Sequence, residues 1–396
     1  MITSNLYQKK QDCCGCELCS LVCPKQIIEM WEDEEGFLYP RVKDESACVD
    51  CNRCISVCPV KSSGRESQTP QFSYGGFVND LQAVKASSSG GFATAISRSF
   101  INCGGIVYGV RYSSDCKSIV YDRADNVASL DGFMTSKYAQ AYKKGIYLDI
   151  KKDLKEGKKV LFVGLPCEVS ALYHYVNNQE NLFTISLICH GPTSQKVHRQ
   201  FCEQIIKKNG AKYIEHMSLR YKKRGWKPYY ILARFNNGKE YLCEFAKTDY
   251  DVAFQYLKRP SCSVCRYKLG NLEFGLVADL VLGDYHAVRK DRPEYNSWGV
   301  SQATALTNKG KELMSLLDNQ ATLLPISENV IATTNIALRA PIPSKKHRNK
   351  FSSVFCDKGL HKACNLLVVQ YEKRKRKAIK SVKRLLVKFR NAVLHK

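Results

Sequence analysis

The pattern C-x2-C-x2-C-x3-C-P occurs twice near the start of this 396-residue chain, over residues 13–24 and 48–59. The chain has nineteen cysteines, and nine of them lie in residues 13–58. The first ten residues, MITSNLYQKK, contain no apolar region of the kind that a secretory signal requires. Thiols in such a chain are expected to stay reduced, so metal binding or catalysis is favoured over a disulfide framework.

This spacing is the bacterial ferredoxin run for a [4Fe–4S] cluster, in which the fourth cysteine of each run ligates the other cluster. We therefore expect one cluster to be held by Cys13, Cys16, Cys19 and Cys58. A second cluster would be held by Cys48, Cys51, Cys54 and Cys23. Cys14 does not fit the spacing and is interpreted as a spare. The alternative, structural zinc, typically pairs two separated C-x2-C units instead of two complete runs.

The pattern along the chain predicts three parts: residues 1–66, a two-cluster 4Fe–4S ferredoxin-like domain; residues 72–340; and residues 341–396, a basic extension. A polar stretch, residues 61–70, is typical of a linker. The expected fold class is α/β. A bacterial ferredoxin-like (α+β) domain precedes a larger α/β domain with a mixed, partly parallel sheet and a β-hairpin insertion.

Short apolar runs alternate with helical periods in the larger domain. Buried strands are expected at Ile106–Tyr112, Val160–Leu165, Phe183–Ile188 and Val277–Leu282. Helices are expected at Phe92–Phe100, Glu168–Val176 and Val197–Lys207. Between residues 213 and 245, a hairpin is expected from Tyr230–Phe235 and Glu240–Phe245, which flank an Asn-Asn-Gly turn.

Four cysteines of the larger domain have suggestive positions. Cys167 and Cys189 each follow a predicted strand, and parallel strands would bring both thiols to the carboxyl edge of the sheet, where ligands bind in α/β folds. Cys262 and Cys265 form a C-x2-C pair. Together the four could form a third four-thiolate site; the alternative is two buried thiols and a separate redox or zinc pair.

A Ser/Gly stretch, residues 85–91, leads directly into the predicted helix that starts at Phe92. Small residues let the backbone approach a ligand, and the helix N-terminus offers free N–H groups to a phosphate. A helix cap without a ligand is the alternative interpretation. A G-x-G-x-x-G pattern is absent, so a standard dinucleotide site of the Rossmann type is not supported.

Five stretches in order resemble the coenzyme F420 hydrogenase/dehydrogenase beta-subunit family, a group that 7-hydroxymethyl chlorophyll a reductase also resembles. They are ASSSGGFATA (86–95), SKYAQ (136–140), GLPC (164–167), CHG (189–191) and C-x2-C…ADLVLGD (262–284). The similarity covers about residues 72–340, and a ferredoxin block is a common fusion to this family.

The resemblance implies FAD and a [4Fe–4S] cluster in this domain, with Cys167, Cys189, Cys262 and Cys265 as the cluster ligands. It also implies flavin contacts from Ser88, Ser89, Gly90, Gly91, Ser136, Lys137 and Tyr138. Lys137 would pair with a phosphate or the flavin ring, the alternative being a solvated surface lysine.

His190 lies next to a ligand implied by the resemblance. It could donate a proton near the flavin or be a packed core histidine. The remaining cysteines match no motif and are interpreted as small buried hydrophobes: Cys103, Cys116, Cys202, Cys243, Cys356 and Cys364.

The net charge of +24 is concentrated in the C-terminal extension. Residues 341–396 carry 17 of the 61 basic residues and 2 of the 37 acidic ones. Within them, Tyr371–Lys396 has apolar residues at helical spacing. Such a basic amphipathic helix can contact an anionic membrane surface, dock on the parent domain or extend into solvent. Nucleic acid is the least favoured partner, because no zinc-finger or RNA-binding signature accompanies the charge.

Together these features predict a cytoplasmic iron–sulfur flavoprotein oxidoreductase, which the basic extension could hold peripherally at the inner face of the membrane. It would pass electrons between a ferredoxin-type donor and an organic substrate through 4Fe–4S clusters and FAD. The resemblance raises coenzyme F420 as one substrate, although the family includes reductases of other compounds. Two alternatives stay open: an electron-transfer subunit of a larger complex without its own substrate site, and a basic nucleic-acid-binding iron–sulfur protein.

Overall fold

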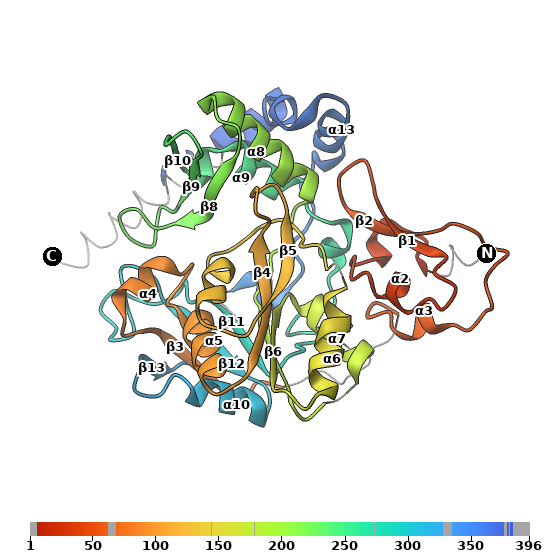
Figure 1. Cartoon of the computed structure of the whole chain (residues 1–396). Coiled ribbons are helices and arrows are strands. Elements are labelled where there is room, and N and C mark those ends of the chain that lie inside the picture. The colour runs from red at the N-terminus through yellow and green to blue at the C-terminus, as the bar shows by residue number, and fades with distance from the viewer. Residues whose placement is uncertain are drawn as a thin grey trace.

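An eight-stranded mixed sheet organises the molecule (Figure 1). The structure is a computed structural model, and it describes residues 6–61, 69–143, 145–177, 179–271, 274–327, 335–375, 378–379 and 381–382. The strand order in the large sheet is β13-β3-β12-β11-β7-β6-β4-β5. The strands span Phe72–Val78 (β3), Ile106–Tyr112 (β4), Ile119–Ala124 (β5), Val160–Gly164 (β6), Leu182–Leu187 (β7), Leu280–Asp284 (β11), Ser301–Ala305 (β12) and Ala321–Pro325 (β13).

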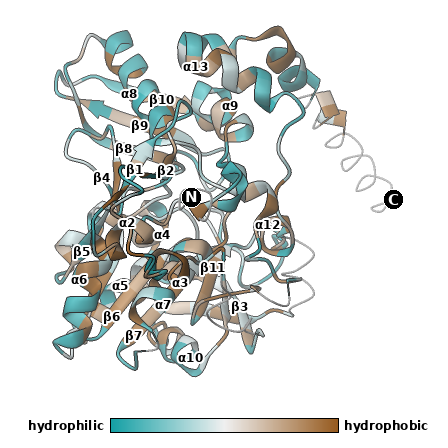
Figure 2. Ribbon diagram, turned by 90° about the vertical axis from the view of Figure 1, so that its right-hand side faces the viewer, coloured by the Kyte–Doolittle hydropathy of each residue, from teal (hydrophilic) through white to brown (hydrophobic). Residues whose placement is uncertain are grey.

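The centre of this sheet is parallel and its two sides are antiparallel. Strands β4, β6, β7 and β11 run parallel to one another, and β5, β12, β3 and β13 add antiparallel pairings at the two sides. The central strands are apolar on both faces, which is why they appear as continuous hydrophobic runs in the sequence (Figure 2). The predicted α/β fold with a mixed, partly parallel sheet is therefore confirmed.

Helices cover both faces of the sheet. One face packs against α6 (Ile146–Lys155) and α7 (Pro166–Val176), and the other against α5 (Phe92–Asn102) and α10 (Asn308–Ser315). Two short helices, α4 (Leu81–Ala86) and α12 (Ile336–Arg339), and a 3-10 turn, η2 (Ala128–Phe133), lie in the connections.

Strand β11 begins three residues later than the predicted strand Val277–Leu282. The reason is Asp279, whose buried carboxylate accepts hydrogen bonds from the backbone N–H and the hydroxyl of Thr184, both at 2.9 Å. The Asp279 side chain thus takes the two donors of Thr184 in β7, and the backbone pairing of β11 with β7 starts one residue later, at Leu280. A local hydrogen bond of this type competes with regular strand pairing.

A second, smaller layer lies above the large sheet (Figure 1). It contains the antiparallel strands β8 (Ile214–Tyr221), β9 (Tyr230–Phe235) and β10 (Glu240–Glu244), the predicted hairpin being β9–β10. Strand β10 stops at Glu244, because Phe245 starts the 3-10 turn η3 (Phe245–Lys247). Three helices pack on this sheet: α8 (Gln195–Asn209), α9 (Asp249–Tyr256) and α13 (Arg348–Cys364).

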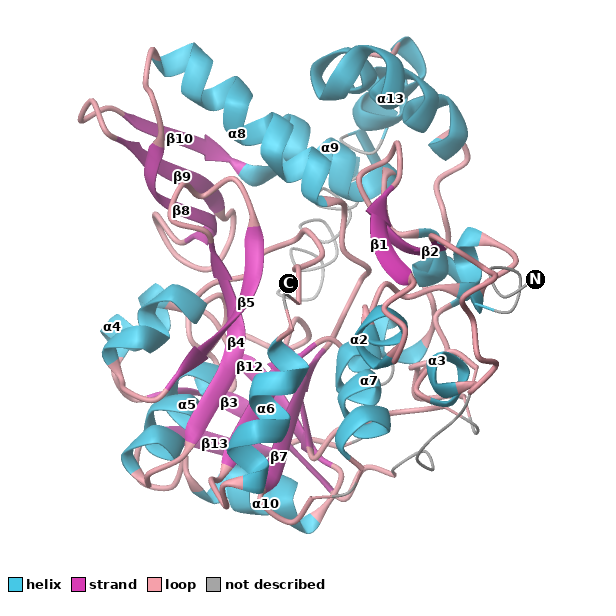
Figure 3. Cartoon of the chain, turned by 45° about the vertical axis from the view of Figure 1, so that its right-hand side comes forward, coloured by secondary structure: helices cyan, strands magenta, loops and turns pink. Residues whose placement is uncertain are grey.

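The N-terminal block, residues 6–61, lies at one side of the large sheet beside α7 (Figure 3). It contains the 3-10 turn η1 (Lys10–Asp12), helices α2 (Leu18–Val22) and α3 (Arg53–Ser56), and a hairpin of β1 (Ile28–Glu32) and β2 (Leu38–Val42). Both short helices follow a cysteine loop, and the structure places the two loops together. The 3-10 turn η4 (Pro260–Val264) of the large domain contacts η1 of the N-terminal block.

The tip of the β1–β2 hairpin inserts into the upper layer. Phe37 is fully buried in the same core as Phe351 and Phe355 of α13. The Glu35 carboxylate receives two hydrogen bonds from the Arg348 guanidinium, at 2.9 and 2.6 Å, and a further one from the Ser352 hydroxyl. We call this contact the Glu35–Arg348 clasp. It ties the C-terminal helix directly to the N-terminal block.

The basic extension is described only in part. Residues 367–375 are helical, whereas most of the expected helix Tyr371–Lys396 and most of the linker 61–70 lie outside the described residues. Within the described part, no helix is both long enough and apolar enough to cross a membrane.

The Glu35–Arg348 clasp is expected to contribute strongly to stability. Replacing Arg348 with Ala leaves the Glu35 carboxylate unpaired in a nearly buried position, which typically costs ~3 kcal/mol or more. Denaturant unfolding should therefore show a loss of this size. The matched control is Arg289→Ala, which breaks an exposed pair with Asp291 and should cost under about 1 kcal/mol. Equal effects of the two variants would contradict this assignment.

Candidate metal and cofactor site

Six cysteines line a small cavity on the inner side of the N-terminal block: Cys14, Cys54 and the four that are expected to share one cluster. Cys13 and Cys16 lie in the loop before α2, Cys19 lies within α2, and Cys58 follows α3. These are the residues expected to share one cluster, and we call them the first site. The cavity is also lined by apolar side chains, among them Leu6, Met30 and Ile55. Burial raises the pKa of the Cys58 thiol to about 11.

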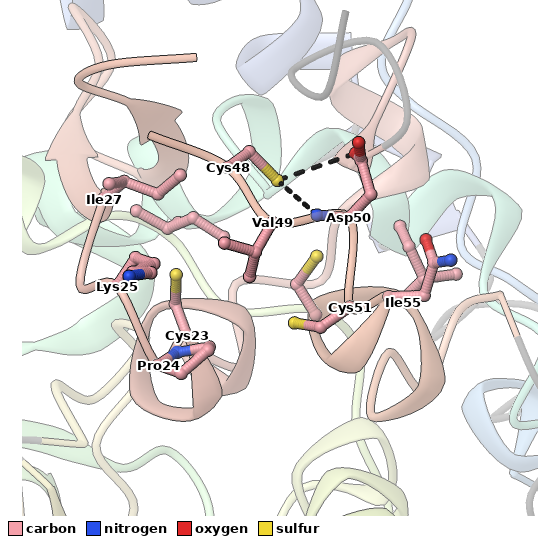
Figure 4. A pocket seen from close by; sticks show the side chains of 12 residues that line it. Cys23, Pro24, Lys25, Ile27, Cys48, Val49, Asp50, Cys51 and Ile55 are labelled. Atoms are coloured by element: carbon pink, nitrogen blue, oxygen red, sulfur yellow. Dashed lines mark hydrogen bonds between the residues drawn. The ribbon is translucent and has the colours of Figure 1, made fainter. Parts of the chain in front are cut away.

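A second cavity lies next to the first and has the other predicted set around it. Cys23, Cys48, Cys51 and Cys54 line it, and we call them the second site. Figure 4 shows Cys23, Cys48 and Cys51 around this space, with the backbone N–H of Asp50 donating to the Cys48 sulfur at 3.3 Å. Cys51 is exposed, so this site opens to solvent. The structure thus groups the fourth cysteine of each run with the three cysteines of the other run.

The third set comes from three different places in the large domain. Cys167 lies at the start of α7 after β6, and Cys189 follows β7, so the parallel strands bring both to one sheet edge. Cys262 lies in η4, and Cys265 follows it. We call these four cysteines the third site.

Three of these thiols lie close enough for the charges of two of them to affect the third. Burial, followed by the charges of Cys189 and Cys265, raises the pKa of the Cys262 thiol. Gly191 has a φ of +92° and packs against Cys262, whose Cβ is 2.8 Å from the position that a Cβ on Gly191 would take. A side chain here would push the η4 loop away from Cys189, so this glycine permits the close approach of the two loops.

Among the described residues, no three His, Cys, Asp or Glu side chains converge closely enough to bind a single metal ion. A [4Fe–4S] cluster does not require such convergence, since each thiolate ligates a different iron. The grouping of the cysteines and the charges around them therefore decide whether these residues fit clusters.

Two buried basic side chains lie beside the cysteines of the first and third sites, and neither is paired with a carboxylate among the described residues. Arg259 and Lys268 are both buried, and no ion pair joins either of them to an acidic side chain in the described part of the chain. The Lys268 ammonium donates to the carbonyl of Cys189 at 3.2 Å and to that of Ala337. A buried charge without a counter-ion is costly, whereas a cluster with four thiolates is anionic and would supply that counter-charge. These two side chains therefore fit a bound cluster.

Cys14, the residue outside the spacing, lies where the N-terminal block meets the large domain. It is buried, and its thiol is within hydrogen-bonding reach of the thiols of Cys16 and Cys167. One of these belongs to the first site and the other to the third. The two sites therefore face each other across a single side chain.

The Ser/Gly loop before α5 is held tightly against the large sheet. The Ser89 hydroxyl donates to the Val300 carbonyl at 2.7 Å, and the Gly90 N–H donates to the Ser301 hydroxyl at 2.9 Å. A Cβ on Gly90 would lie 2.5 Å from the Gly76 carbonyl oxygen. Strand packing alone therefore explains this glycine. Gly91 starts α5 with a φ of +92° and no side-chain cap, which leaves the first N–H groups of the helix without a side-chain acceptor.

The predicted flavin-contacting residues fall into two groups. Ser136 donates from its N–H and its hydroxyl to the Ser88 hydroxyl, at 2.7 and 2.9 Å, so these two residues are in contact. Tyr138 instead packs against the rings of Phe245 and Phe254.

Lys137 is not a solvated surface lysine. Its ammonium donates to the carbonyls of Gly132, Met134 and Thr135 and lies 5.3 Å from the Tyr112 ring centre. Burial lowers its pKa to about 7. All three donors are used locally, so binding a phosphate would require this side chain to release them.

His190 is exposed, so it is not the packed core histidine that the sequence left as an alternative. Of the cysteines without a motif, Cys116, Cys202 and Cys364 are buried as expected. Cys103 is exposed, contrary to the prediction, because it is the C-cap of α5 and lies at the surface turn that ends this helix.

Several side chains around the sites were not predicted from the sequence. Arg259, Lys268, Lys143 and Tyr267 carry no local signal, because each gains its position from contacts distant in the chain. Gln140 was part of a quoted motif without an assigned role. In the structure it donates to the Cys14 carbonyl at 2.7 Å.

Comparison with known proteins gives two family matches. Residues 157–328 match the family described as the C terminus of the coenzyme F420 hydrogenase/dehydrogenase beta subunit, and residues 12–62 match a 4Fe-4S dicluster domain. The matches confirm the resemblance over residues 157–328 and the two-cluster character of residues 12–62, which was predicted from the cysteine runs. No curated protein matches the chain. A solved chain from the structure titled "Xenon derivatization of the F420-reducing [NiFe] hydrogenase complex from Methanosarcina barkeri" is similar at 17% identity and a TM-score of 0.45. The similarity covers 75% of this chain and 91% of that one.

The grouping of the cysteines predicts which substitutions lose iron. Cys58→Ser removes one ligand of the first site and should lower the iron content of the anaerobically purified protein by about four atoms per chain. Cys103→Ser, an exposed cysteine far from any motif, should leave the iron content unchanged. Iron and sulfide analysis checks both. Unchanged iron in Cys58→Ser would remove this residue from the site.

Proposed function

We propose that this chain, which carries the C-terminal domain of the coenzyme F420 hydrogenase/dehydrogenase beta-subunit family behind a 4Fe-4S dicluster domain, is an iron–sulfur flavoprotein oxidoreductase. The general part of this proposal is that the chain is an iron–sulfur electron-transfer protein of the hydrogenase/dehydrogenase type. The finer proposal adds a third cluster, FAD, a ferredoxin-type donor and an organic substrate.

The observation that carries the third cluster is the charge around its four cysteines. Four thiols from β6–α7, from the end of β7 and from η4 gather next to Lys268, a buried cation without an acidic partner among the described residues. Its positive charge would offset the negative charge of a cluster held by Cys167, Cys189, Cys262 and Cys265. A structural zinc or redox pair at Cys262 and Cys265 alone would leave Cys167 and Cys189 unexplained.

The support for FAD is the edge of the sheet next to the Ser/Gly loop. The uncapped start of α5 offers backbone N–H groups to an anionic group. Lys222 is buried there and donates to the carbonyls of Val84 and Ser89, and burial lowers its pKa to about 7. A phosphate at this loop would favour the charged form of that lysine. When bound, FAD would couple single-electron transfer from clusters to two-electron chemistry on a substrate.

The residues of this chain would then have separate roles. Ser88, Ser89, Gly90, Gly91 and Ser136 would hold the flavin, while Lys137 and Tyr138 would shape its surroundings. His190 follows a cluster ligand and is exposed, so it could exchange a proton with solvent. Coenzyme F420 is one member of the substrate class, which comprises organic two-electron acceptors or donors.

Metal and flavin content tests this proposal. We expect about twelve irons and one FAD per chain after anaerobic purification, because three clusters carry about four irons each. Cys262→Ser should lower the iron content to about eight. Cys243→Ser, a change on β10 away from all three sites, should retain about twelve. About eight irons and no flavin in the unmodified protein would overturn the third cluster and the flavin.

The same preparation separates an enzyme from a pure electron-transfer subunit. Reduced ferredoxin or a viologen dye is supplied as donor to the isolated chain, and flavin bleaching is followed optically. Turnover with an organic acceptor such as F420 is measured in parallel. Flavin reduction with turnover supports the oxidoreductase. Cluster reduction without any flavin signal or turnover would leave the chain as an electron carrier for a partner.

A further inference from the structure

The large domain holds the loops of the first site through their backbone. Four side chains donate to carbonyl oxygens of these loops: Arg259 to Cys13 at 2.8 Å, Gln140 to Cys14 at 2.7 Å, Lys143 to Gly15 at 3.2 Å and Tyr267 to Pro59 at 2.6 Å. The second site lies next to the first, with Cys54 and Ile55 lining both cavities, and its residues Cys51 and Val49 are exposed. The block is therefore docked through one of its two cluster sites.

Arg259 is the centre of this contact. Its side chain is 2% exposed, and its guanidinium lies against the rings of Phe37 and Tyr39, 5.6 and 4.4 Å from their centres. The five donors of a guanidinium form a rigid fork. Here they reach the Cys13 carbonyl, Gln140 Oε1 at 2.9 Å and the Leu38 carbonyl at 2.8 Å.

The same guanidinium reaches a cysteine of the first site. Its Nη2 lies 3.5 Å from the Cys13 sulfur and donates to it. Gly15 adjoins the guanidinium so closely that a Cβ there would lie 2.6 Å from Nη1. The loop and the arginine therefore fit each other only with a glycine at this position. No carboxylate within the described residues pairs with Arg259 to reduce its positive charge at the sulfur.

We propose that Arg259 is a positioning residue that holds the first site against the third and makes a cluster at the first site easier to reduce. The inference rests on the proposed function, since it assumes clusters at both sites. Hydrogen bonds to a ligand sulfur and nearby positive charge favour the state with one additional electron. With clusters bound, the second site would supply the single electron, because Cys51 opens that site to a redox partner. The electron would then leave toward the third site.

This assignment gives the two sites of the block different tasks. The second site, with Cys51 exposed, is the outer one, at which an external donor exchanges electrons with the chain. The first site is the inner one, next to Cys14 and Cys167.

The test is a potentiometric titration of the full-length holoprotein, followed by electron paramagnetic resonance. Arg259→Gln removes the charge and most of the fork, and we expect one cluster to shift to a more negative potential while the others stay unchanged. Arg259→Lys keeps the charge and should give a smaller shift of the same sign. The matched control is Arg199→Gln, since Arg199 also donates from the large domain to the N-terminal block, but to the Glu32 carboxylate at 2.9 Å, which pairs its charge. It should shift no potential.

The shifted signal is assigned with Cys58→Ser, which should lack that same signal. A shift of a different cluster, or no shift with full iron content, would overturn the proposal. If Arg259→Gln loses iron, selective loss of the first-site signal supports the positioning role, whereas equal loss of all signals overturns it. An unmodified protein with about eight irons that still shows the Arg259 shift would overturn the third cluster while the role of Arg259 at the first site holds.

Discussion

Parallel pairing of β6, β7 and β11 is the constraint on which the rest of the molecule depends. Each of these strands ends at the same edge of the large sheet, so the segments that follow them are forced together there. Cys167 and Cys189 are carried to this edge by β6 and β7. The η4 loop and the first loop of the N-terminal block pack onto it. The pairing thus places Cys167 and Cys189 of the third site beside the first site.

Local chemistry made much of this architecture predictable from the sequence. The runs of β6 and β7 were visible because strands buried on both faces are mostly apolar, with Thr184 and Ser186 as the polar residues of β7. The helix α7 was predicted from its periodicity but two residues late: it begins at Pro166, and the Glu168 carboxylate accepts from the Leu165 N–H at 3.0 Å. The cysteine runs were readable because cluster ligation requires a fixed spacing.

Contacts between distant segments could not be predicted in this way. Nothing near Arg259 in the sequence indicates that its side chain will meet Cys13, which is 246 residues away. The late start of β11 depends on a carboxylate that bonds to a different strand. In the Ser/Gly loop, ligand binding and backbone packing would each be enough to explain the glycines. Packing against Gly76 accounts for Gly90 without any ligand, so composition alone cannot decide.

The Glu35–Arg348 clasp has a consequence for the order of events during synthesis. Its two partners are 313 residues apart, so the contact can form only when almost the whole chain has left the ribosome. The hairpin tip that it fixes belongs to the same block as both cysteine loops. Until translation reaches α13, the tip of the β1–β2 hairpin therefore lacks its partners Phe351, Phe355 and Arg348.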